Sequence, residues 1–522
     1  MDCTRKVYSP AFRRPEPAKA GTTNADLSFI QRSHQYAEIS METKDLLGLI
    51  LIPSAIVAAT ALACFSQRAR DAMFFFLLAG GVMAERLNIN FVSQYWYRGT
   101  SRGFEVSFVD ILAVSLLASA CLFPRYKHLR RYWPLSLGPM ILYFIYACFS
   151  VAISEPKLYG VFELAKIVRA MVFFLAAAWF VQTERELKLL ILGLGCAVLL
   201  EGAYVFKQRF VSGIYRAVGT LDHANSLSMY LCMTAPVLAA AATAGFPRWI
   251  RWLAFGTLGV AVVSIVLTVS RAGIPIFCLL LLGTAVFTMS FRLSLKKIAA
   301  AAAIAACFAG FLVSQWENLK IRYQIERSLE EEYFDERSEG RGHYFLLAKA
   351  IVDDQFWGVG LNNWSYWVCK KYGAERGWFY EDYDDLDYVP PKEALSDILY
   401  APPAHNLGAL TVGELGWPGL AIFGILWFHW FRAASRFLWR RSPAMGRCLG
   451  AALFFSIFGV FLQSFTEWVF RQPSILFTFH VLLGVLASLC YQKRVSQPAC
   501  VETVQSDSEE LCEPKPAYPA FC

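Results

Sequence analysis

The sequence has few charged residues for its length. Asp, Glu, Lys and Arg make up 17% of 522 residues, whereas 56% are hydrophobic and the mean hydropathy is +0.41. A soluble chain of this length cannot hide that much apolar surface in one core. The apolar residues also come in long blocks, which is typical of helices that cross a bilayer. We therefore expect an all-α polytopic membrane protein.

Metal-binding and disulfide patterns are also missing. There are fourteen cysteines, but no CxxC and no Cys/His spacing typical of a metal site. Many of them lie in or beside apolar blocks, where a thiol behaves as a small hydrophobe. The large polar loop at 315–405 contains Cys369 alone. The residues thus favour neither a disulfide-stapled loop nor a bound metal or other cofactor.

The two ends of the chain lack apolar character. The polar N-terminal tail at 1–45 carries no apolar signal-peptide core, so the first membrane helix is expected to stay in the mature protein. The C-terminal tail at 492–522 contains Pro, Ser and Glu without an apolar face, which predicts disorder.

Thirteen apolar blocks are each near the roughly 20 residues that cross about 30 Å of hydrocarbon. They predict twelve or thirteen transmembrane helices, ten of them in a bundle at 46–314 and the rest at 406–491. The second block is the least regular, because Gly80 and Gly81 are followed by Glu85 and Arg86. The blocks are 46–65, 72–90, 107–123, 134–153, 164–182, 187–206, 226–245, 250–269, 272–290, 295–314, 406–430, 447–465 and 474–491.

Basic residues gather in alternate connectors between the blocks, which is how cytoplasmic loops read. This pattern explains the net charge of +8 without a nucleic-acid partner. The opposite, outer side then receives 207–225, the turn at 270–272 and the loop at 315–405. Thirteen spans would put the N-terminal tail outside and twelve would put it inside, and the sequence leaves both open. The basic connectors are 125–131, 248–251, 292–297, 432–441 and 493–494.

The loop at 315–405 is polar, rich in aromatic residues and strongly acidic at 330–339 and 381–387. A connection of that length is rarely without function. Part of it should be helical, and Gly358-Val359-Gly360 should stop that helix. The apolar stripe at helical spacing consists of Tyr344, Phe345, Ala348, Ile351 and Val352.

Several short motifs stand out on the predicted outer side. They are Arg216-Ala217-Val218-Gly219-Thr220 with His223 and Asn225, Ser270-Arg271-Ala272-Gly273, Arg341 before the loop helix, Gly358-Val359-Gly360, and His405-Asn406 preceding Gly413-Glu414-Leu415-Gly416. In this order they resemble the O-antigen ligase and polymerase family. The resemblance covers about 107–490 and departs from the family pattern at Asp354-Gln355-Phe356-Trp357 and in the acidic insert at 381–387.

The resemblance implies a bacterial inner-membrane enzyme whose active site faces the periplasm. Such enzymes move a glycan from an undecaprenyl diphosphate carrier to a sugar hydroxyl, on lipid A core or on another glycan, without a metal. The leaving diphosphate needs cations, and arginine offers a permanent charge and a planar fork. The hydroxyl needs a base, and histidine titrates in the useful range. A single displacement assisted by one base implies inversion.

By resemblance, Arg216 and Arg341 bind the diphosphate, Arg271 is a third cation, and His405 is the general base. Each of these residues also has a plainer interpretation. Arg216 and Arg271 suit lipid headgroups at the bilayer surface, Arg341 an ion pair with neighbouring glutamates, and His405 a structural contact of the loop.

Secondary candidates lie nearby. His223 and Asn225 would assist donor binding or would cap the next helix. Lys166 and Arg169 share a helix face with Glu163, which favours an internal salt-bridge ladder or a wall of the donor groove. For Glu414 we favour a buried structural contact.

The sequence leaves three glycan-transfer activities open: ligase, polymerase and protein O-glycosyltransferase, with the first two preferred. The rival is a transporter or flippase of lipid-linked glycans. A transporter should show repeats and interrupted spans around a midplane site, whereas the polar residues here are concentrated on the outer side.

Overall fold

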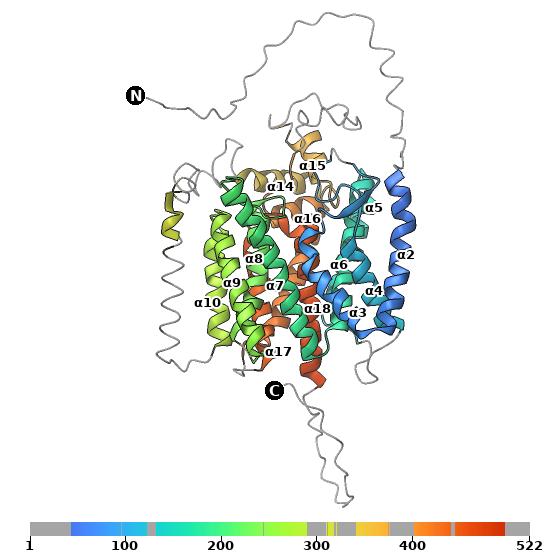
Figure 1. The fold of residues 1–522 in the computed structure, drawn as a ribbon. Coiled ribbons are helices and arrows are strands. Elements are labelled where there is room, and N and C mark those ends of the chain that lie inside the picture. The colour runs from blue at the N-terminus through green and yellow to red at the C-terminus, as the bar shows by residue number, and fades with distance from the viewer. Residues whose placement is uncertain are drawn as a thin grey trace, which may run out of the picture.

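The protein is an all-α, multi-pass membrane protein, as the composition predicts (Figure 1). In the computed structural model, seven of the described helices are long and apolar enough to cross a membrane, and three shorter helices are also apolar. The described residues are 43–94, 97–122, 132–243, 245–289, 310, 312–317, 320, 341–373, 375, 401–439 and 444–495.

The first half of the chain forms helices around one small antiparallel hairpin, in which Asn88 pairs with Ser107. Its elements are α2 (Thr43–Phe65), α3 (Gln67–Ala79), η1 (Gly81–Met83), β1 (Asn88–Phe91), β2 (Phe104–Ser107), α4 (Phe108–Leu122), α5 (Leu137–Ile153), α6 (Lys157–Phe180), α7 (Glu184–Phe206), η2 (Lys207–Val211), α8 (Ala224–Thr243), α9 (Arg248–Leu267) and α10 (Gly273–Thr288).

The second half adds a short helical cap and three long helices. Its elements are α14 (Gly342–Asp354), α15 (Trp364–Trp367), η3 (Val368–Tyr372), α16 (Leu407–Ser435), α17 (Met445–Ser464), η6 (Val469–Arg471) and α18 (Pro473–Val495).

Burial separates central from peripheral helices. In α18, 94% of the most apolar stretch is buried, because α18 packs against α6 and α17. In α2 only 11% of the corresponding stretch is buried, and many of its apolar side chains are exposed, among them Leu49, Ile50 and Leu51. Helices that are apolar on all sides are stable in this way only when other helices or lipid surround them.

The predicted span at 72–90 is wrong in its second half. Helix α3 ends at Ala79, and the chain continues through a turn into β1. Gly80 ends the helix where Phe108 packs closely, since a Cβ at Gly80 would clash with that ring. The charged pair Glu85 and Arg86 then lies in the turn rather than in a helix. Most of the predicted span at 295–314, and both predicted tails except their edges, lie outside the described residues.

The predicted helix in the outer loop is confirmed as α14. Its apolar stripe is buried at Tyr344, Ala348, Ile351 and Val352, whereas Phe345 is exposed. Helix α14 packs against α16. The acidic segments at 330–339 and 381–387 lie outside the described residues.

Two glycine motifs that are far apart in the sequence contact each other directly. Helix α16 is kinked at Gly416, whose backbone has φ 67° and ψ −173°. The loop after α14 crosses this kink, where Val359 N donates to Gly413 O at 3.0 Å and Gly360 N donates to Glu414 O at 2.8 Å. The N–H groups of the loop therefore donate hydrogen bonds to carbonyl oxygens that have no partner within the interrupted helix.

Gly416→Ala should destabilise the protein by about 2–4 kcal/mol. Its backbone angles are almost restricted to glycine, and a Cβ there would clash with Phe356 O. Gly424→Ala is the matched control, because it lies on the same helix and its Cβ would meet nothing within 4 Å. Thermal unfolding in one detergent compares the stability of the two variants. Equal stability of Gly416→Ala and Gly424→Ala would contradict this interpretation of the kink.

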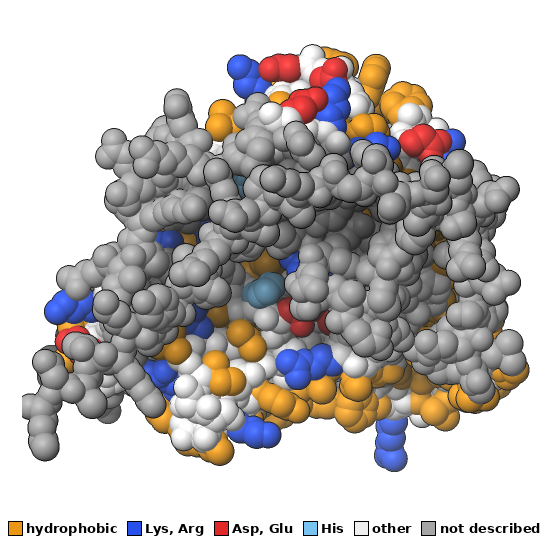
Figure 2. All heavy atoms as spheres, turned by 90° about the horizontal axis from the view of Figure 1, so that it is seen from above, with side chains coloured by type: hydrophobic (Ala, Val, Ile, Leu, Met, Phe, Trp, Pro, Cys, Tyr) orange, Lys and Arg blue, Asp and Glu red, His pale blue; other side chains and the backbone are white. Residues whose placement is uncertain are grey.

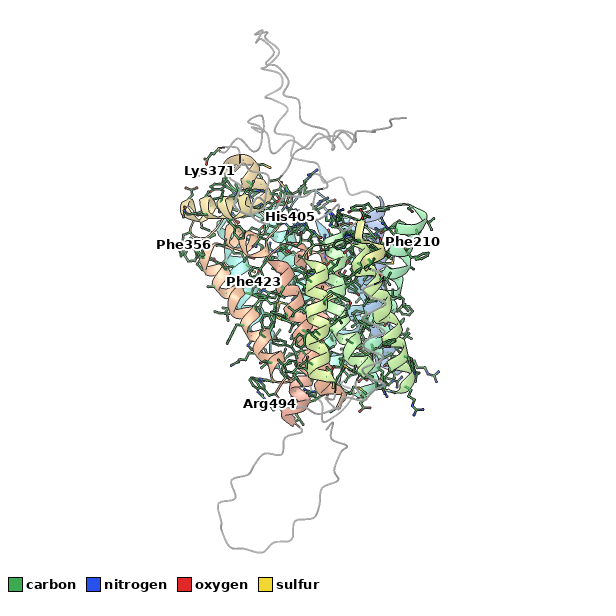
Figure 3. All side chains as sticks on the ribbon, turned by 90° about the vertical axis from the view of Figure 1, so that its left-hand side faces the viewer. Phe210, Phe356, Lys371, His405, Phe423 and Arg494 are labelled. Atoms are coloured by element: carbon green, nitrogen blue, oxygen red, sulfur yellow. The ribbon has the colours of Figure 1, made fainter. Side chains whose placement is uncertain are left out.

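The two ends of the bundle differ in their residues. His405 and Lys371 lie at one end and Arg494 at the other (Figure 3). At the end with Arg494, Lys493 Nζ donates to Arg436 O at 2.8 Å, so two predicted basic connectors meet. We call the end with His405, α14 and α15 the outer face. Helix α2 begins there, beside β1, which favours an odd number of spans.

Candidate functional site

A cavity of about 730 Å³ opens on the outer face. Its walls come from the β1–β2 hairpin, the start of α8, the segment before α16 and the connection between α17 and α18. Histidine, acidic and basic side chains are visible together in a hollow of this face (Figure 2). The cavity combines segments that are up to 370 residues apart, from Arg98 to Trp468.

Glu467, in the α17–α18 connection, is at the centre of this polar cluster. Its Oε1 accepts from Arg341 Nη2 at 2.9 Å and from Asn225 Nδ2 at 2.6 Å. Its Oε2 lies 2.8 Å from His405 Nδ1. The Glu467 side chain is only 4% exposed, so these partners compensate for much of the cost of burying a carboxylate.

The cap of α16 fixes the position of His405. Asn406 Oδ1 accepts from Ala409 N at 2.8 Å, as an N-cap residue does. Its Nδ2 donates to Phe465 O at 2.7 Å, at the end of α17. The start of α16 is thereby joined to the α17–α18 connection, and His405 is held opposite Glu467.

The contact with Glu467 sets the tautomer of the His405 ring. An ionised carboxylate can only accept, so Nδ1 carries the proton that bonds to Glu467 Oε2. In the neutral ring, Nε2 then holds the free lone pair. The His405 side chain is 36% exposed and lines the cavity. The geometry gives a histidine that can accept a proton at Nε2 from a group in the cavity.

A polar network holds the loop that carries Arg216. Gly219 N donates to Gln208 Oε1 at 2.8 Å, and Thr220 N donates to Glu201 Oε2 at 2.9 Å. Gly219 has φ +68°, and a Cβ there would clash with the Glu201 carboxylate. The Gly-Thr pair of the motif is therefore explained by the turn that presents Arg216.

Arg216 lines the cavity and is partly satisfied by neutral groups. Its Nη2 donates to Asn225 Oδ1 at 3.3 Å and its Nε to Thr268 O at 3.4 Å. Desolvation lowers the pKa of Arg216; Glu467 and Tyr215 raise it, and the like charges of Arg271 and Arg341 lower it further. The guanidinium remains charged, with an excess of positive charge around it that suits an anion.

The other two predicted cations do not line the cavity. Arg341 pairs with Glu467, 126 residues away, and the neighbouring glutamates at 330–339 lie outside the described residues. Arg271 lies in the turn between α9 and α10, close enough for its positive charge to lower the pKa of Arg216. Ser270 in the same turn donates to Asn225 Oδ1 at 3.3 Å.

Neither His223 nor Asn225 caps α8 with its side chain. The helix begins at Ala224, and the Asn225 side chain instead bridges Glu467, Arg216 and Ser270, because those polar groups surround it. His223 is exposed in the cavity wall, and its side chain makes no hydrogen bond to any residue that the structure describes.

The secondary candidates inside the bundle form ion pairs that do not line the cavity. Lys166 Nζ lies 2.8 Å from Glu163 Oε2, whereas Arg169 pairs with Asp110 of α4 at 2.8 Å. The predicted ladder therefore stops at Lys166, since α4 supplies a nearer carboxylate to Arg169. Glu414 Oε2 lies 2.5 Å from Arg471 Nη1, and both side chains are buried.

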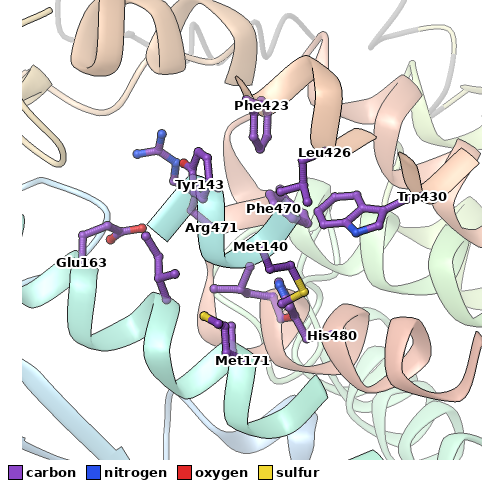
Figure 4. Close-up of a pocket in the computed structure, with 13 residues that line it drawn as sticks. Met140, Tyr143, Glu163, Met171, Phe423, Leu426, Trp430, Phe470, Arg471 and His480 are labelled. Atoms are coloured by element: carbon purple, nitrogen blue, oxygen red, sulfur yellow. The ribbon is translucent and has the colours of Figure 1, made fainter. Parts of the chain in front are cut away.

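Arg471 and Glu163 also border a second cavity, between α5, α6, α16 and α18 (Figure 4). This cavity is lined mainly by apolar side chains, among them Tyr143, Phe423 and Trp430. Its volume is about 50 Å³, well below the roughly 150 Å³ that holds a benzene molecule. It is too small for a polyprenyl chain.

Three charged residues of the cavity lining were not predicted from the sequence: Glu467, Arg98 and Arg102. Glu467 could have been found as the one acidic residue in the short gap between the last two apolar blocks, at the end opposite the basic connectors. The two arginines follow the apolar block at 72–90, which the sequence predicts to be one helix. The sequence therefore does not predict the β1–β2 hairpin that carries them.

The described residues contain no group of three or more His, Cys, Asp or Glu side chains placed to hold a metal ion. Comparison with protein-family models and with curated proteins finds no match to this chain. The polar cavity and its residues are therefore the basis for assigning a function.

Proposed function

We propose that the protein is a membrane glycosyltransferase that moves a glycan from a polyprenyl diphosphate carrier to an acceptor hydroxyl in the outer cavity. The observation that carries the proposal is the His405–Glu467 pair, which lies beside Arg216 in one cavity at the outer face. The pair supplies a base, and the arginine supplies a cation for the leaving group.

In this reaction, His405 Nε2 takes the proton of the acceptor hydroxyl as its oxygen bonds to the anomeric carbon. The bond from that carbon to the phosphate oxygen breaks, and the diphosphate leaves with the electron pair. Glu467 stabilises the imidazolium that forms, and the proton then passes to water. One displacement inverts the anomeric carbon.

The position of the cavity supports a lipid-linked donor. The cavity lies at one end of the bundle, where a diphosphate headgroup would meet the bilayer surface while its chain stays in the lipid. A transporter would instead need a polar site near the midplane. We therefore rank glycan transfer, of the ligase or polymerase type, above a flippase.

Purified protein in lipid nanodiscs, given lipid-linked glycan and a glycan or lipid A core acceptor, tests this proposal. We expect a glycosidic product with inverted configuration and release of polyprenyl diphosphate. Movement of the donor between the leaflets of sealed vesicles that contain the same protein tests the alternative function. A flippase would move the donor between leaflets and form no glycosidic product.

Arg216→Ala should weaken binding of a prenyl diphosphate by about 10- to 150-fold, since a charge-assisted hydrogen bond contributes roughly 1.5–3 kcal/mol. Arg216→Lys should retain only part of this affinity, because lysine keeps the positive charge but lacks the planar guanidinium group that binds two phosphate oxygens at once. Binding of farnesyl diphosphate to the purified variants measures this. Arg209→Ala is the control, because Arg209 is a neighbouring arginine that bonds to Tyr215 O and does not line the cavity. Equal affinity of Arg216→Ala and wild type would end the assignment.

A further inference from the structure

The β1–β2 hairpin contributes two arginines to the cavity that the mechanism above does not use. Arg98 and Arg102 both line it, and both side chains are exposed. Neither guanidinium makes a hydrogen bond or an ion pair with any residue in the described ranges. The backbone carbonyls of Arg98 and Arg102 accept hydrogen bonds from Ser365 Oγ and Gln94 N. Two arginines in one cavity wall, with their guanidinium groups not used in hydrogen bonds to the described part of the protein, suit an anionic ligand.

The backbone that carries these arginines is held by buried groups. Asn362 Oδ1 accepts from Thr100 N at 2.7 Å, and Asn362 Nδ2 donates to Ser101 O at 2.9 Å. Glu163 Oε2 accepts from Ser101 Oγ at 2.6 Å, and Lys166 Nζ donates to Thr100 O at 2.7 Å.

These four bonds fix Thr100 and Ser101, two of the three residues that lie between Arg98 and Arg102. The buried Glu163–Lys166 pair thus positions the hairpin rather than touching a ligand. A loop held in this way presents its two arginines at fixed positions, which lowers the entropic cost of binding an anion.

The charges around this pair differ from those around Arg216. Desolvation lowers the pKa of Arg102, the nearby Arg98 lowers it further, and Asp222 and Glu105 raise it. Arg98 and Arg102 belong to the β1–β2 hairpin, whereas Arg216 belongs to the segment before α8. The cavity therefore has arginines on two of its walls.

We propose that Arg98 and Arg102 form a second anion subsite, which binds a carboxylate or phosphate group carried by the glycan itself and not the diphosphate of the lipid donor. The inference rests on the proposed function in taking a glycan as the ligand. It narrows the substrate class to acidic glycans, because a neutral sugar would offer the two guanidinium groups no anionic partner.

Binding to purified full-length protein in nanodiscs tests the subsite with four probes: trigalacturonate, maltotriose carrying one phosphate, neutral maltotriose, and farnesyl diphosphate. Wild type should bind at least one acidic glycan about tenfold or more tightly than maltotriose. R98Q/R102Q should lose that preference and keep its affinity for farnesyl diphosphate within about twofold. R98K/R102K should retain part of the preference. The acidic probe that binds more tightly identifies carboxylate or phosphate as the preferred group.

K370Q/K371Q is the matched control, because it removes two positive charges from the outer face without altering the cavity lining. It should bind all probes as wild type does. Equal binding of acidic and neutral glycans by wild type would overturn the subsite, and so would a loss of farnesyl diphosphate binding in R98Q/R102Q as large as in R216A. If wild type binds acidic glycans through these arginines but does not bind farnesyl diphosphate, the subsite stands and the proposed donor is wrong.

Discussion

Replacing His405 with alanine should lower the rate of glycan transfer by about 10²–10⁴-fold, the usual contribution of a general base. The variant should still fold and bind donor, because His405 precedes α16 and its neighbour Asn406 caps that helix. Turnover per folded molecule and affinity for farnesyl diphosphate, measured on one purified sample, check both parts.

His223→Ala is the matched control for this variant. His223 lines the same cavity, but its side chain has no hydrogen-bond partner among the described residues, so its loss should change the rate far less. Near-normal turnover in His405→Ala would end the general-base assignment.

Glu467→Gln should lower the transfer rate by no more than His405→Ala does, which is about 10²–10⁴-fold, because Glu467 acts through His405. An amide can donate to Nδ1, which would place the ring proton on Nε2 and leave the base without its lone pair. The amide also loses the charge that stabilises the imidazolium and the ion pair with Arg341. Transfer rates of the purified variant measure the effect.

Glu467→Asp serves as the conservative comparison, since it keeps the charge and shortens the reach. It should recover part of the activity that Glu467→Gln loses. If Glu467→Gln instead transfers glycan at the wild-type rate and loses only thermal stability, Glu467 is a structural residue and the orientation of His405 does not depend on it.

The sequence predicts well what depends on local pattern. Long apolar blocks predict the helices, and the apolar spacing around Ala348 and Ile351 predicts α14. Predictions from the same patterns are wrong where tertiary packing determines the local structure. The helix at 72–90 stops early because Gly80 packs against Phe108, and the Asn225 side chain turns from a helix cap to Glu467 because a buried carboxylate needs donors.

The site could be predicted only in part, for a physical reason. His405 and Arg216 belong to motifs that the sequence displays, whereas their shared surroundings come from pairs distant in the chain. Glu467 lies 62 residues from His405 and 126 from Arg341. No periodicity joins such residues, since the folded bundle alone brings the α17–α18 connection against the starts of α8, α14 and α16.

The most direct test of the central claim is the single-turnover rate of glycan transfer in four purified proteins: wild type, His405→Ala, Glu467→Gln and the double variant. If Glu467 acts through His405, the double variant should be no slower than His405→Ala, because the second substitution removes nothing further. All three variants should bind farnesyl diphosphate through Arg216. Losses that multiply in the double variant, or a wild type that forms no glycosidic product, would contradict the account.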